Sequence, residues 1–476
     1  PSSLIERLQR LDEDLQIEPM PAFDLEETAP AAVFHLLGGE MRKATAETPL
    51  SPLWQDIYGF FDENSQWQKH LSLLKQGIGK TATPERLSPK TAKALYGKNI
   101  FSSVSRLERF AGCPFSFFAE YGLKAEERRL YQLNTPDLGS LFHEVLELFS
   151  NKLEQDSLSW TSLTKEETTA RIHAAVEDAA PRLGNRILLD SAANQYLIRR
   201  LKRISTRAAW TLVQHLQQGD FVPAGYEVGF GAHEALPPIV IRLQDGGSLI
   251  LNGKIDRVDL LDANGTRYVK IIDYKSGNKT FHFQDIYYGL QLQLLVYLDA
   301  YLKYYKKTGA SFKPGGVFYF RITDPTLALD EELSAEAIEK ILYEKMRMSG
   351  LLLQEDVLIH GLDHSLAESR SSAIVPVGYT KKGDPTAASN LATEEQYAAI
   401  LDFVATRTQE IGDAMKAGII TPAPYRDGQR TPCSYCSYRS LCRHSYGEAP
   451  RWRKLKKIDK ADFWESITPK QPPETE

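Results

Sequence analysis

Apolar residues recur with helical spacing between positions 138 and 153. They are Leu138, Leu141, Phe142, Val145, Leu146, Phe149 and Leu153, and together they form one stripe of a helix. His143 and Glu147 are four residues apart, so they share a face roughly opposite this stripe. A lone histidine on such a face is usually a surface residue. His143 becomes a candidate ligand only if strands that carry further ligands pack against its face.

A different pattern, typical of a β-hairpin, covers Gly253–Lys275. Asn264-Gly265 stands between two β-prone runs, and this dipeptide is the strongest local signal for a two-residue type I′ turn because both turn residues need φ > 0. The turn fixes a register in which the numbers of paired residues sum to 529. This register predicts three compatible cross-strand pairs: Asp259 with Lys270, Asp262 with Arg267, and Leu261 with Tyr268.

The same register places Asp256 directly opposite Asp273. Facing residues have Cβ atoms about 4.5–5.5 Å apart, and two ionised carboxylates that close repel each other unless a cation lies between them or one takes up a proton. Lys275 follows Asp273 by two residues, so its side chain lies on the same face of the strand. The stretch therefore predicts a metal cage beside a cation. The alternative is an exposed hairpin with solvated charges, although the apolar residues around these charges favour a buried or half-buried sheet.

The patterns on either side of the hairpin predict further strands and helices. We expect strands over 226–230 and 317–320 and helices over 285–307 and 393–416. Gln293 and Tyr297 are four apart in the first of these helices, so they project together. The order of helix, strands, helix, strand and helices predicts an α/β domain with a mixed sheet flanked by helices.

Three regions are distinguishable along the chain. Residues 1–95 carry amphipathic helical patches interrupted by prolines, and they predict a helical region that precedes the main domain, residues 96–446. Residues 447–476 form a basic tail. From Arg439 to Lys460 there are eight Lys and Arg against two acids, with aromatic residues interleaved. Such a tail suits contact with phosphates and bases, and a solvated terminus is the alternative.

Composition is that of an ordinary soluble globular protein, with 42% apolar and 25% charged residues among 476. No apolar run approaches the roughly 18–20 residues that a membrane span needs, and the charged first residues do not form a signal peptide. We therefore expect a cytoplasmic location and no membrane partner. The chain begins at Pro1 without Met, so we expect a fragment of a longer protein. A net charge of −5 provides no global attraction to nucleic acid.

Three of the four cysteines, Cys433, Cys436 and Cys442, form a C-x2-C-x5-C pattern. In a cytoplasmic protein, clustered thiols indicate a metal rather than disulfides. With Cys113 they could hold Zn²⁺ in a tetrahedron or a [4Fe–4S] cube with one thiolate per iron. Structural zinc sites usually come as two close pairs, so a trio with one remote partner favours the cluster. The prolines beside Cys113 and Cys433 fit ligands in exposed loops.

Taken together, the motifs resemble the C-terminal nuclease domain of the AddB family, the B subunits of bacterial AddAB helicase–nucleases. The motifs are Ser105-Arg106-Leu107-Glu108, Cys113-Pro114-Phe115, Gly139-x3-His143-x3-Glu147, Gly253-x-Ile255-Asp256-Arg257, Asp273-Tyr274-Lys275-Ser276, Gln293-x3-Tyr297 and Cys433-x2-Cys436-x5-Cys442. The resemblance runs from about residue 95 to residue 446. Each motif is weak alone, and the full set is highly specific.

The resemblance implies a RecB-like nuclease of the PD-(D/E)xK, restriction-endonuclease-like class, with an iron–sulfur cluster that holds the domain together. It also implies work on the ends of double-strand breaks beside an AddA-type helicase–nuclease subunit. Carried over by position, His143, Asp256 and Asp273 would be the Mg²⁺ ligands and Lys275 the catalytic lysine. Gln293 and Tyr297 would support them. Cys113, Cys433, Cys436 and Cys442 would hold the [4Fe–4S] cluster. The helicase-like regions that precede this domain in the family are absent apart from residues 1–95.

The leading hypothesis is a Mg²⁺-dependent nuclease that cleaves single DNA strands delivered to it. In the alternative, the chain is a non-catalytic DNA-binding scaffold stapled by an iron–sulfur or zinc site, and its acids are structural. A zinc-stapled interaction module is the third possibility. Metal content and a nuclease assay distinguish the three.

Overall fold

The computed structural model describes residues 29–44, 48–78, 86–126, 135–182, 192–327, 332–442, 444 and 452–468. The chain forms two compact units, Pro1–Thr83 and Pro84–Glu476. The sequence predicted a boundary at residue 95. None of the helices in these described ranges combines the length and apolarity that a membrane crossing requires.

The first unit is helical, as the sequence predicted for the part of it that is described. It contains α2 (Pro30–Lys43), α3 (Pro52–Glu63) and α4 (Ser65–Ile78). Leu37, Phe61 and Leu71, one from each helix, form its small buried core. The ring of Trp67 packs against Phe61, with ring centroids 5.1 Å apart. Each helix thus buries one apolar stripe against the other two.

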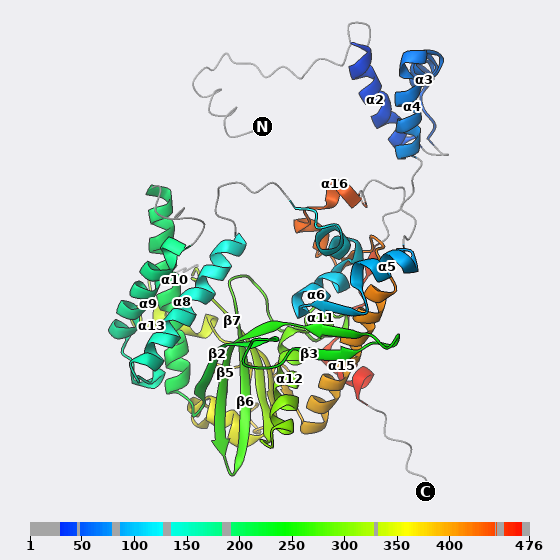
Figure 1. The fold of residues 1–476 in the computed structure, drawn as a ribbon. Coiled ribbons are helices and arrows are strands. Elements are labelled where there is room, and N and C mark those ends of the chain that lie inside the picture. The colour runs from blue at the N-terminus through cyan, green and yellow to red at the C-terminus, as the bar shows by residue number, and fades with distance from the viewer. Residues whose placement is uncertain are drawn as a thin grey trace, which may run out of the picture. The chain divides into compact units, whose positions relative to one another are not determined.

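A six-stranded mixed sheet forms the centre of the second unit (Figure 1). Its order is β2 (Val222–Phe230), β5 (Gly253–Ala263), β6 (Thr266–Lys275), β7 (Phe312–Arg321), β8 (Ser349–Leu353) and β9 (Leu391–Ala392). The β6–β7 and β8–β9 pairs are parallel, and the other three are antiparallel. The predicted mixed sheet is confirmed.

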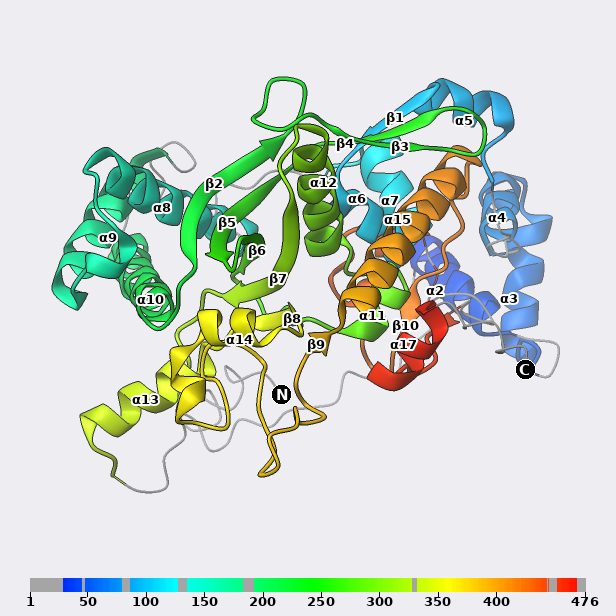
Figure 2. The same cartoon turned by 90° about the horizontal axis from the view of Figure 1, so that it is seen from below.

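Helices cover both faces of this sheet. On one side lie α8 (Thr135–Gln155), α9 (Lys165–Ala179) and α10 (Ala192–Gln217), and on the other lie α12 (Gln293–Lys307) and α15 (Glu394–Lys416) (Figure 2). The short helix η2 (Trp160–Ser162) joins α8 to α9. Farther along the chain come α13 (Ala335–Lys345), α14 (Asp356–Leu362) and η4 (His364–Ala367). The apolar stripe predicted for α8 is buried from Leu141 to Leu153, so its polar face is left for chemistry.

The hairpin of β5 and β6 has the predicted register. Ala263 pairs with Thr266, and the ladder continues to Arg257 and Ile272. Asn264 and Gly265 have φ values of 51° and 76°, as a type I′ turn requires. The predicted pair of Asp259 and Lys270 is fully buried, with Lys270 Nζ 2.9 Å from Asp259 Oδ2. Asp256 and Asp273 come next in this register.

The helix expected over 285–307 is in fact two. The short α11 (Phe283–Tyr287) ends before Gly289, whose φ of 74° belongs to the left-handed region that favours glycine. The chain then starts again as α12 at Gln293. This break places Gln293 at a helix N-terminus instead of in a helix interior.

A second, three-stranded sheet lies beside α15. Its order is β1 (Asn99–Ser102), β4 (Ser248–Leu251) and β3 (Ile239–Arg242). Around it the chain forms α5 (Pro89–Tyr96), α6 (Val104–Gly112), α7 (Pro114–Phe117) and the π-helical turn η1 (Phe118–Gly122). Thr393 and Gln396 form a capping box at the start of α15, close to where the sequence predicted this helix to begin.

The described part of the C-terminal segment, residues 452–468, packs onto the second unit. Strands β10 (Tyr425–Arg426) and β11 (Arg453–Lys454) are paired in parallel. Helix α17 (Lys460–Ile467) buries Phe463 and Trp464, whose rings contact Phe283 of α11. The short elements η5 (Pro432–Tyr435) and α16 (Arg439–Cys442) carry Cys433 and Cys442, and Cys436 directly follows η5.

Candidate functional site

Three side chains from three elements bring ligand atoms to one point. His143 comes from α8, Glu227 from β2 and Asp256 from β5, and the three ligand atoms all lie within 4.8 Å of one another. His143 Nδ1 is 3.3 Å from Asp256 Oδ1 and 4.0 Å from Glu227 Oε1. Such a group of nitrogen and oxygen donors could hold a metal ion. The condition set for His143 is met, since its helix face packs against the strands that carry the acids.

Glu227 was missed by the sequence reasoning. The pairs Tyr226 with Arg257 and Val228 with Ile255 bracket it, so Glu227 lies opposite Asp256 on the strand beside the hairpin. Its φ of 46° is unusual for a non-glycine residue, and such strain is often found at functional sites. Burial and the negative charge of Asp256 raise the pKa of Glu227 to about 7. The only signal in the sequence was a carboxylate within a short apolar strand.

The second half of the site lies on β6. Asp273 is only 3% exposed, and its Oδ2 forms an ion pair with Lys275 Nζ. Its Oδ1 accepts a hydrogen bond of 2.7 Å from Gln293 Nε2 at the start of α12. Tyr274 stands between Asp273 and Lys275 in the sequence. Its backbone N–H donates a hydrogen bond of 2.5 Å to Asp256 Oδ2. The structure therefore joins the two predicted acids through one backbone amide.

The electrostatics of the site indicate an excess of negative charge. Burial and the charge of Asp256 raise the pKa of Asp273 to about 6, although Lys275 opposes them. Burial alone would lower the pKa of Lys275, but the charges of Asp273 and Asp256 outweigh it and raise this pKa. The same competition between burial and Asp256 raises the pKa of His143. Three buried or half-buried carboxylates thus face one lysine and one histidine, and a divalent cation would balance them.

Tyr297, the other predicted supporting residue, lies against the backbone of β5. Its ring and hydroxyl occupy the space that a Cβ at Gly253 would need. It also interacts with the backbone of Lys254. The glycine of the Gly253-x-Ile255-Asp256 motif is therefore explained by the close approach of α12 to the strand that carries Asp256. Within the described ranges, Tyr297 contacts this strand and forms no hydrogen bond with a carboxylate.

Glu108, which the sequence analysis quoted in a motif without a role, holds the start of α12. Its Oε1 accepts hydrogen bonds from the backbone N–H groups of Leu292 (2.8 Å) and Gln293 (3.1 Å). Its Oε2 lies 3.1 Å from Lys279 Nζ. A carboxylate at a helix N-terminus satisfies free N–H groups and interacts favourably with the helix dipole. A chain of contacts therefore runs from Glu108 through Gln293 to Asp273.

The four cysteines line one small cavity of about 20 Å³ together with His444. Cys113 is buried and the other three are half-buried, so the expectation of an exposed loop is wrong for Cys113. Burial raises the pKa of the Cys113 thiol to about 11, and the nearby Cys433 and Cys442 add to this effect. The four cysteines thus share one cavity, which is the placement that a metal or a four-iron cluster held by four thiolates requires.

The loop that carries three of these cysteines is fastened to the rest of the domain. Arg430 forms two parallel hydrogen bonds with the buried carboxylate of Asp285, at 2.8 and 2.5 Å. Tyr438 Oη donates to the carbonyl of Ala125 at 2.9 Å. The cysteine cavity thus lies where the early and late segments of the second unit meet.

Comparison with known proteins gives the family. A family model described as the PD-(D/E)XK nuclease superfamily matches residues 102–443, which is most of the chain. The chain belongs to this superfamily. A second model, described as the fifth domain of the ATP-dependent helicase/deoxyribonuclease AddB, matches residues 28–77. The two matched ranges follow the two compact units.

Curated relatives of this member of the PD-(D/E)XK superfamily extend the similarity over nearly the whole chain. One, from Alkaliphilus oremlandii, is 39% identical over 98% of this chain. Another, from Alkaliphilus metalliredigens, is 40% identical over 93% of it. Both are named as the B subunit of an ATP-dependent helicase/deoxyribonuclease. The chain spans only 41% and 39% of their respective lengths. The resemblance to the AddB family is confirmed.

Proposed function

We propose that this chain is the nuclease domain of a helicase–nuclease B subunit and that it hydrolyses the phosphodiester bonds of single DNA strands with Mg²⁺. The observation that carries the proposal is the convergence of His143, Glu227 and Asp256 beside Asp273 and Lys275. His143 and Glu227 also line a cleft of about 690 Å³, into which a strand could enter. A purely structural role would leave several buried carboxylates without a full counter-charge.

The donor set fits the proposed metal. Carboxylates with one imidazole are hard ligands, which favour Mg²⁺, Mn²⁺ or Ca²⁺ over zinc. His143, Asp256 and Asp273 would hold the ion, as the family resemblance implies. Glu227 joins them in our proposal because its carboxylate lies with the ligand atoms of His143 and Asp256 in one group, whereas Asp273 lies outside that group. A bound Mg²⁺ supplies a Lewis acid for the phosphate and lowers the pKa of the attacking water.

Lys275 acts in this proposal as a permanent cation. Its raised pKa keeps it protonated, so it orients the water or neutralises developing charge and does not serve as a base. Its ion pair with Asp273 fixes its ammonium at the carboxylate. Gln293 holds the other oxygen of Asp273 and so prevents rotation of this carboxylate. Tyr297 fixes the strand that carries Asp256.

We also propose that Cys113, Cys433, Cys436 and Cys442 hold a [4Fe–4S] cluster. The support is their common cavity, and the C-x2-C-x5-C spacing with one distant ligand favours a cluster over zinc. A cluster there would join the segment around residue 113 to the segment around residue 436, so its binding free energy would add to the stability of the folded domain.

The names of the relatives support a partner and a process. They describe the B subunit of an ATP-dependent helicase/deoxyribonuclease. We propose that this chain works beside an AddA-type subunit on the ends of double-strand breaks in the cytoplasm, within a longer protein. ATP use would belong to the parts of the complex outside this chain.

A nuclease assay with the full-length protein tests the proposal. Asp256→Asn and Lys275→Ala should each lower the cleavage of single-stranded DNA at least about a hundredfold, because each removes a charge that acts on the transition state. Asp262→Asn is the matched control: it lies on the same strand, and its side chain is 70% exposed in an ion pair with Arg267. Residual cleavage within about tenfold of wild type in both site variants would favour the non-catalytic scaffold.

A further inference from the structure

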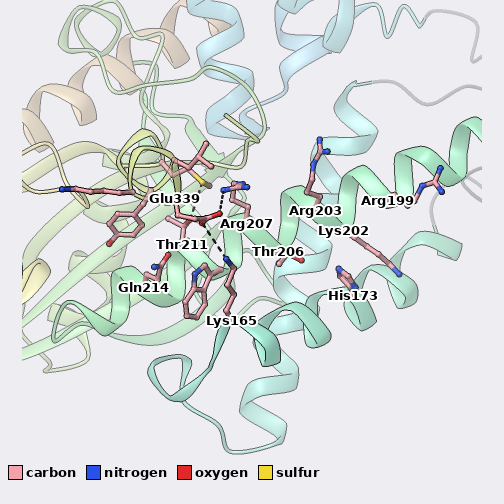
Figure 3. Close-up of a pocket in the computed structure, with 15 residues that line it drawn as sticks. Lys165, His173, Arg199, Lys202, Arg203, Thr206, Arg207, Thr211, Gln214 and Glu339 are labelled. Atoms are coloured by element: carbon pink, nitrogen blue, oxygen red, sulfur yellow. Dashed lines mark hydrogen bonds and ion pairs between the residues drawn. The ribbon is translucent and has the colours of Figure 1, made fainter. Parts of the chain in front are cut away.

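A basic cavity of about 570 Å³ lies between α9, α10 and α13 and shares no residue with the catalytic cleft. Helix α10 supplies most of its wall, as Figure 3 shows. The residues it contributes are Arg199, Lys202, Arg203, Thr206, Arg207, Trp210, Thr211 and Gln214. Their spacing of three and four puts them on one face of the helix, over a length of about 22 Å. This face has no role in the proposed nuclease chemistry.

The cavity is positive although the chain as a whole is negative. Six Lys and Arg residues line it, against the single carboxylate of Glu339. Two more carboxylates lie close by, because Asp324 pairs with Arg203 at 2.8 Å and Glu177 pairs with Lys202 at 2.5 Å. Six cations against three acids still leave an excess of three. The net charge of the whole chain is −5.

Two of the six cations are available to a ligand. Arg199 and Lys340 are exposed, and among the described residues neither forms an ion pair. They come from different walls, Arg199 from α10 and Lys340 from α13. Lys165 and Arg207, by contrast, both point toward Glu339 (Figure 3), each at 3.9 Å. The paired residues hold the walls together while Arg199 and Lys340 remain free to meet an anion.

Aromatic residues lie among these charges. Trp210 and Tyr343 both line the cavity and are half-buried. Cations that follow a backbone, together with aromatic rings on which bases stack, are the combination that binds single strands without sequence preference. The volume lies in the range of about 300–1,000 Å³ typical of sites for one small molecule. A cavity of this size has room for a base or two of a single strand.

We propose that this cavity is an accessory binding site for single-stranded DNA. Arg199 and Lys340 would contact phosphates, and Trp210 would stack on a base. The inference rests on the proposed function to the extent that a nuclease fed with single strands meets this ligand. Binding at this site is nevertheless independent of cleavage, because the two sites share no residue.

Binding of a short fluorescent oligothymidylate to the full-length protein, without divalent metal and at several salt concentrations, tests the proposal. Each phosphate contact on a single strand contributes about 0.7 to the slope of log affinity against log salt. Arg199→Ala/Lys340→Ala should therefore reduce this slope by about 1.4. Arg200→Ala is the matched control, since Arg200 is exposed on the same helix and does not line the cavity. It should leave slope and affinity unchanged.

A second readout separates this site from DNA contacts elsewhere in the full-length protein. An oligonucleotide that carries 4-thiothymidine should photo-crosslink to Trp210 or its neighbours on α10, and Trp210→Leu should remove that crosslink. An unchanged salt slope in the double variant, or the absence of crosslinks on α10 and α13, would overturn the proposal. If the double variant melts below the wild type, the single variant Arg199→Ala replaces it, with half the expected change in slope.

The outcomes also separate this inference from the nuclease. Asp273→Asn should abolish cleavage and keep the crosslink to α10. A wild-type protein that crosslinks there but does not cleave DNA would support the accessory site and overturn the nuclease. If the wild-type protein cleaves DNA and the double variant keeps the wild-type salt dependence of DNA affinity, the nuclease would be supported and the accessory site overturned. Loss of a protein partner in the double variant with unchanged DNA binding would overturn the site in favour of an acidic protein surface.

Discussion

The hydroxyl of Tyr297 on α12 occupies the space that a side chain at Gly253 on β5 would need. Asp256 follows three residues later on the same strand. The position of this carboxylate is therefore set by a contact between a helix and a glycine outside the carboxylate cluster. The Gly253-x-Ile255-Asp256 motif and the Gln293-x3-Tyr297 motif are therefore linked by one contact, the close packing of Tyr297 on Gly253.

We predict that Gly253→Ala lowers the rate of DNA cleavage about a hundredfold, because displacement of a catalytic group by about 1 Å has an effect of this size. The added methyl group would overlap the ring of Tyr297 and push α12 away from β5. Steady-state cleavage of single-stranded DNA measures the effect. Gly277→Ala is the control, since no heavy atom lies within 4 Å of the place that its added methyl group would take. Equal rates in both variants would contradict this account.

A second prediction concerns Glu108, a positioning residue. Glu108→Ala removes the acceptor for the N–H groups of Leu292 and Gln293, so α12 should begin less firmly and Gln293 should hold Asp273 less well. We expect a stability loss of about 1 kcal/mol, as for other lost helix caps, and a fall in kcat of about tenfold at an unchanged KM for DNA. Glu108→Gln keeps one acceptor oxygen and should recover most of the rate. A Gln variant as slow as the Ala variant would argue against positioning through the cap.

The hairpin could be predicted from the sequence because its information is local. Asn264-Gly265 permits one tight turn, and alternation then fixes every pair down to Arg257 and Ile272, which directly precede Asp256 and Asp273 in this register. The placement of His143 also followed, since the apolar stripe of α8 determines which face of the helix remains for the site. Sequence patterns were therefore sufficient for features that depend on residues close together in the chain, such as the hairpin register and the buried face of α8.

Glu227 could not be found in this way. Its place opposite Asp256 depends on how β2 pairs with β5, and a separate sheet segment intervenes between these strands in the chain. The break at Gly289 was missed for a similar reason. A single glycine in a helical pattern is usually tolerated, and here the tertiary contacts of Gln293 and Glu108 decide where the second helix starts.

We predict that Glu227→Gln weakens the affinity for Mn²⁺ or Mg²⁺ about tenfold or more, because it replaces one charged ligand atom in the group with His143 and Asp256. Isothermal titration with Mn²⁺ measures this without reference to cleavage. Glu344→Gln, an exposed change of the same kind on α13, should have no effect. A wild-type Mn²⁺ affinity in Glu227→Gln would mean that Glu227 has a structural role and is not a metal ligand.

The cysteine cavity leads to a prediction about both iron and stability. Cys113→Ser should lower the iron content and the visible absorption of the protein, and it should lower the melting temperature, because binding energy of the cluster is lost from folding. Ser434→Ala, an exposed change between Cys433 and Cys436, is the control. Full iron content and an unchanged melting temperature in Cys113→Ser would exclude the cluster, and zinc in place of iron would favour the tetrahedral site.

His215 on α10 is a buried histidine outside the site. It is 6% exposed, and its ring packs edge-on against Tyr343 and Phe320, with centroids 5.3 and 6.0 Å apart. Neither ring nitrogen has a hydrogen-bond partner among the described residues. Burial, with the nearby charges of Lys270 and Arg257, lowers the pKa of His215 to about 3. The folded protein therefore holds this imidazole neutral.

An unfolded histidine titrates near pH 6.5, so below that pH the unfolded chain takes up a proton that the folded protein refuses. Stability should consequently fall as the pH drops from about 6.5 toward 3, by up to about 1.4 kcal/mol per unit for this one group. His215→Leu removes this contribution, so its melting temperature should fall less steeply than that of the wild type between about pH 6.5 and pH 5. His233→Leu, a change at an exposed histidine, should keep the wild-type slope. Parallel curves for the wild type and His215→Leu would mean that carboxylates alone set the acid sensitivity of the domain.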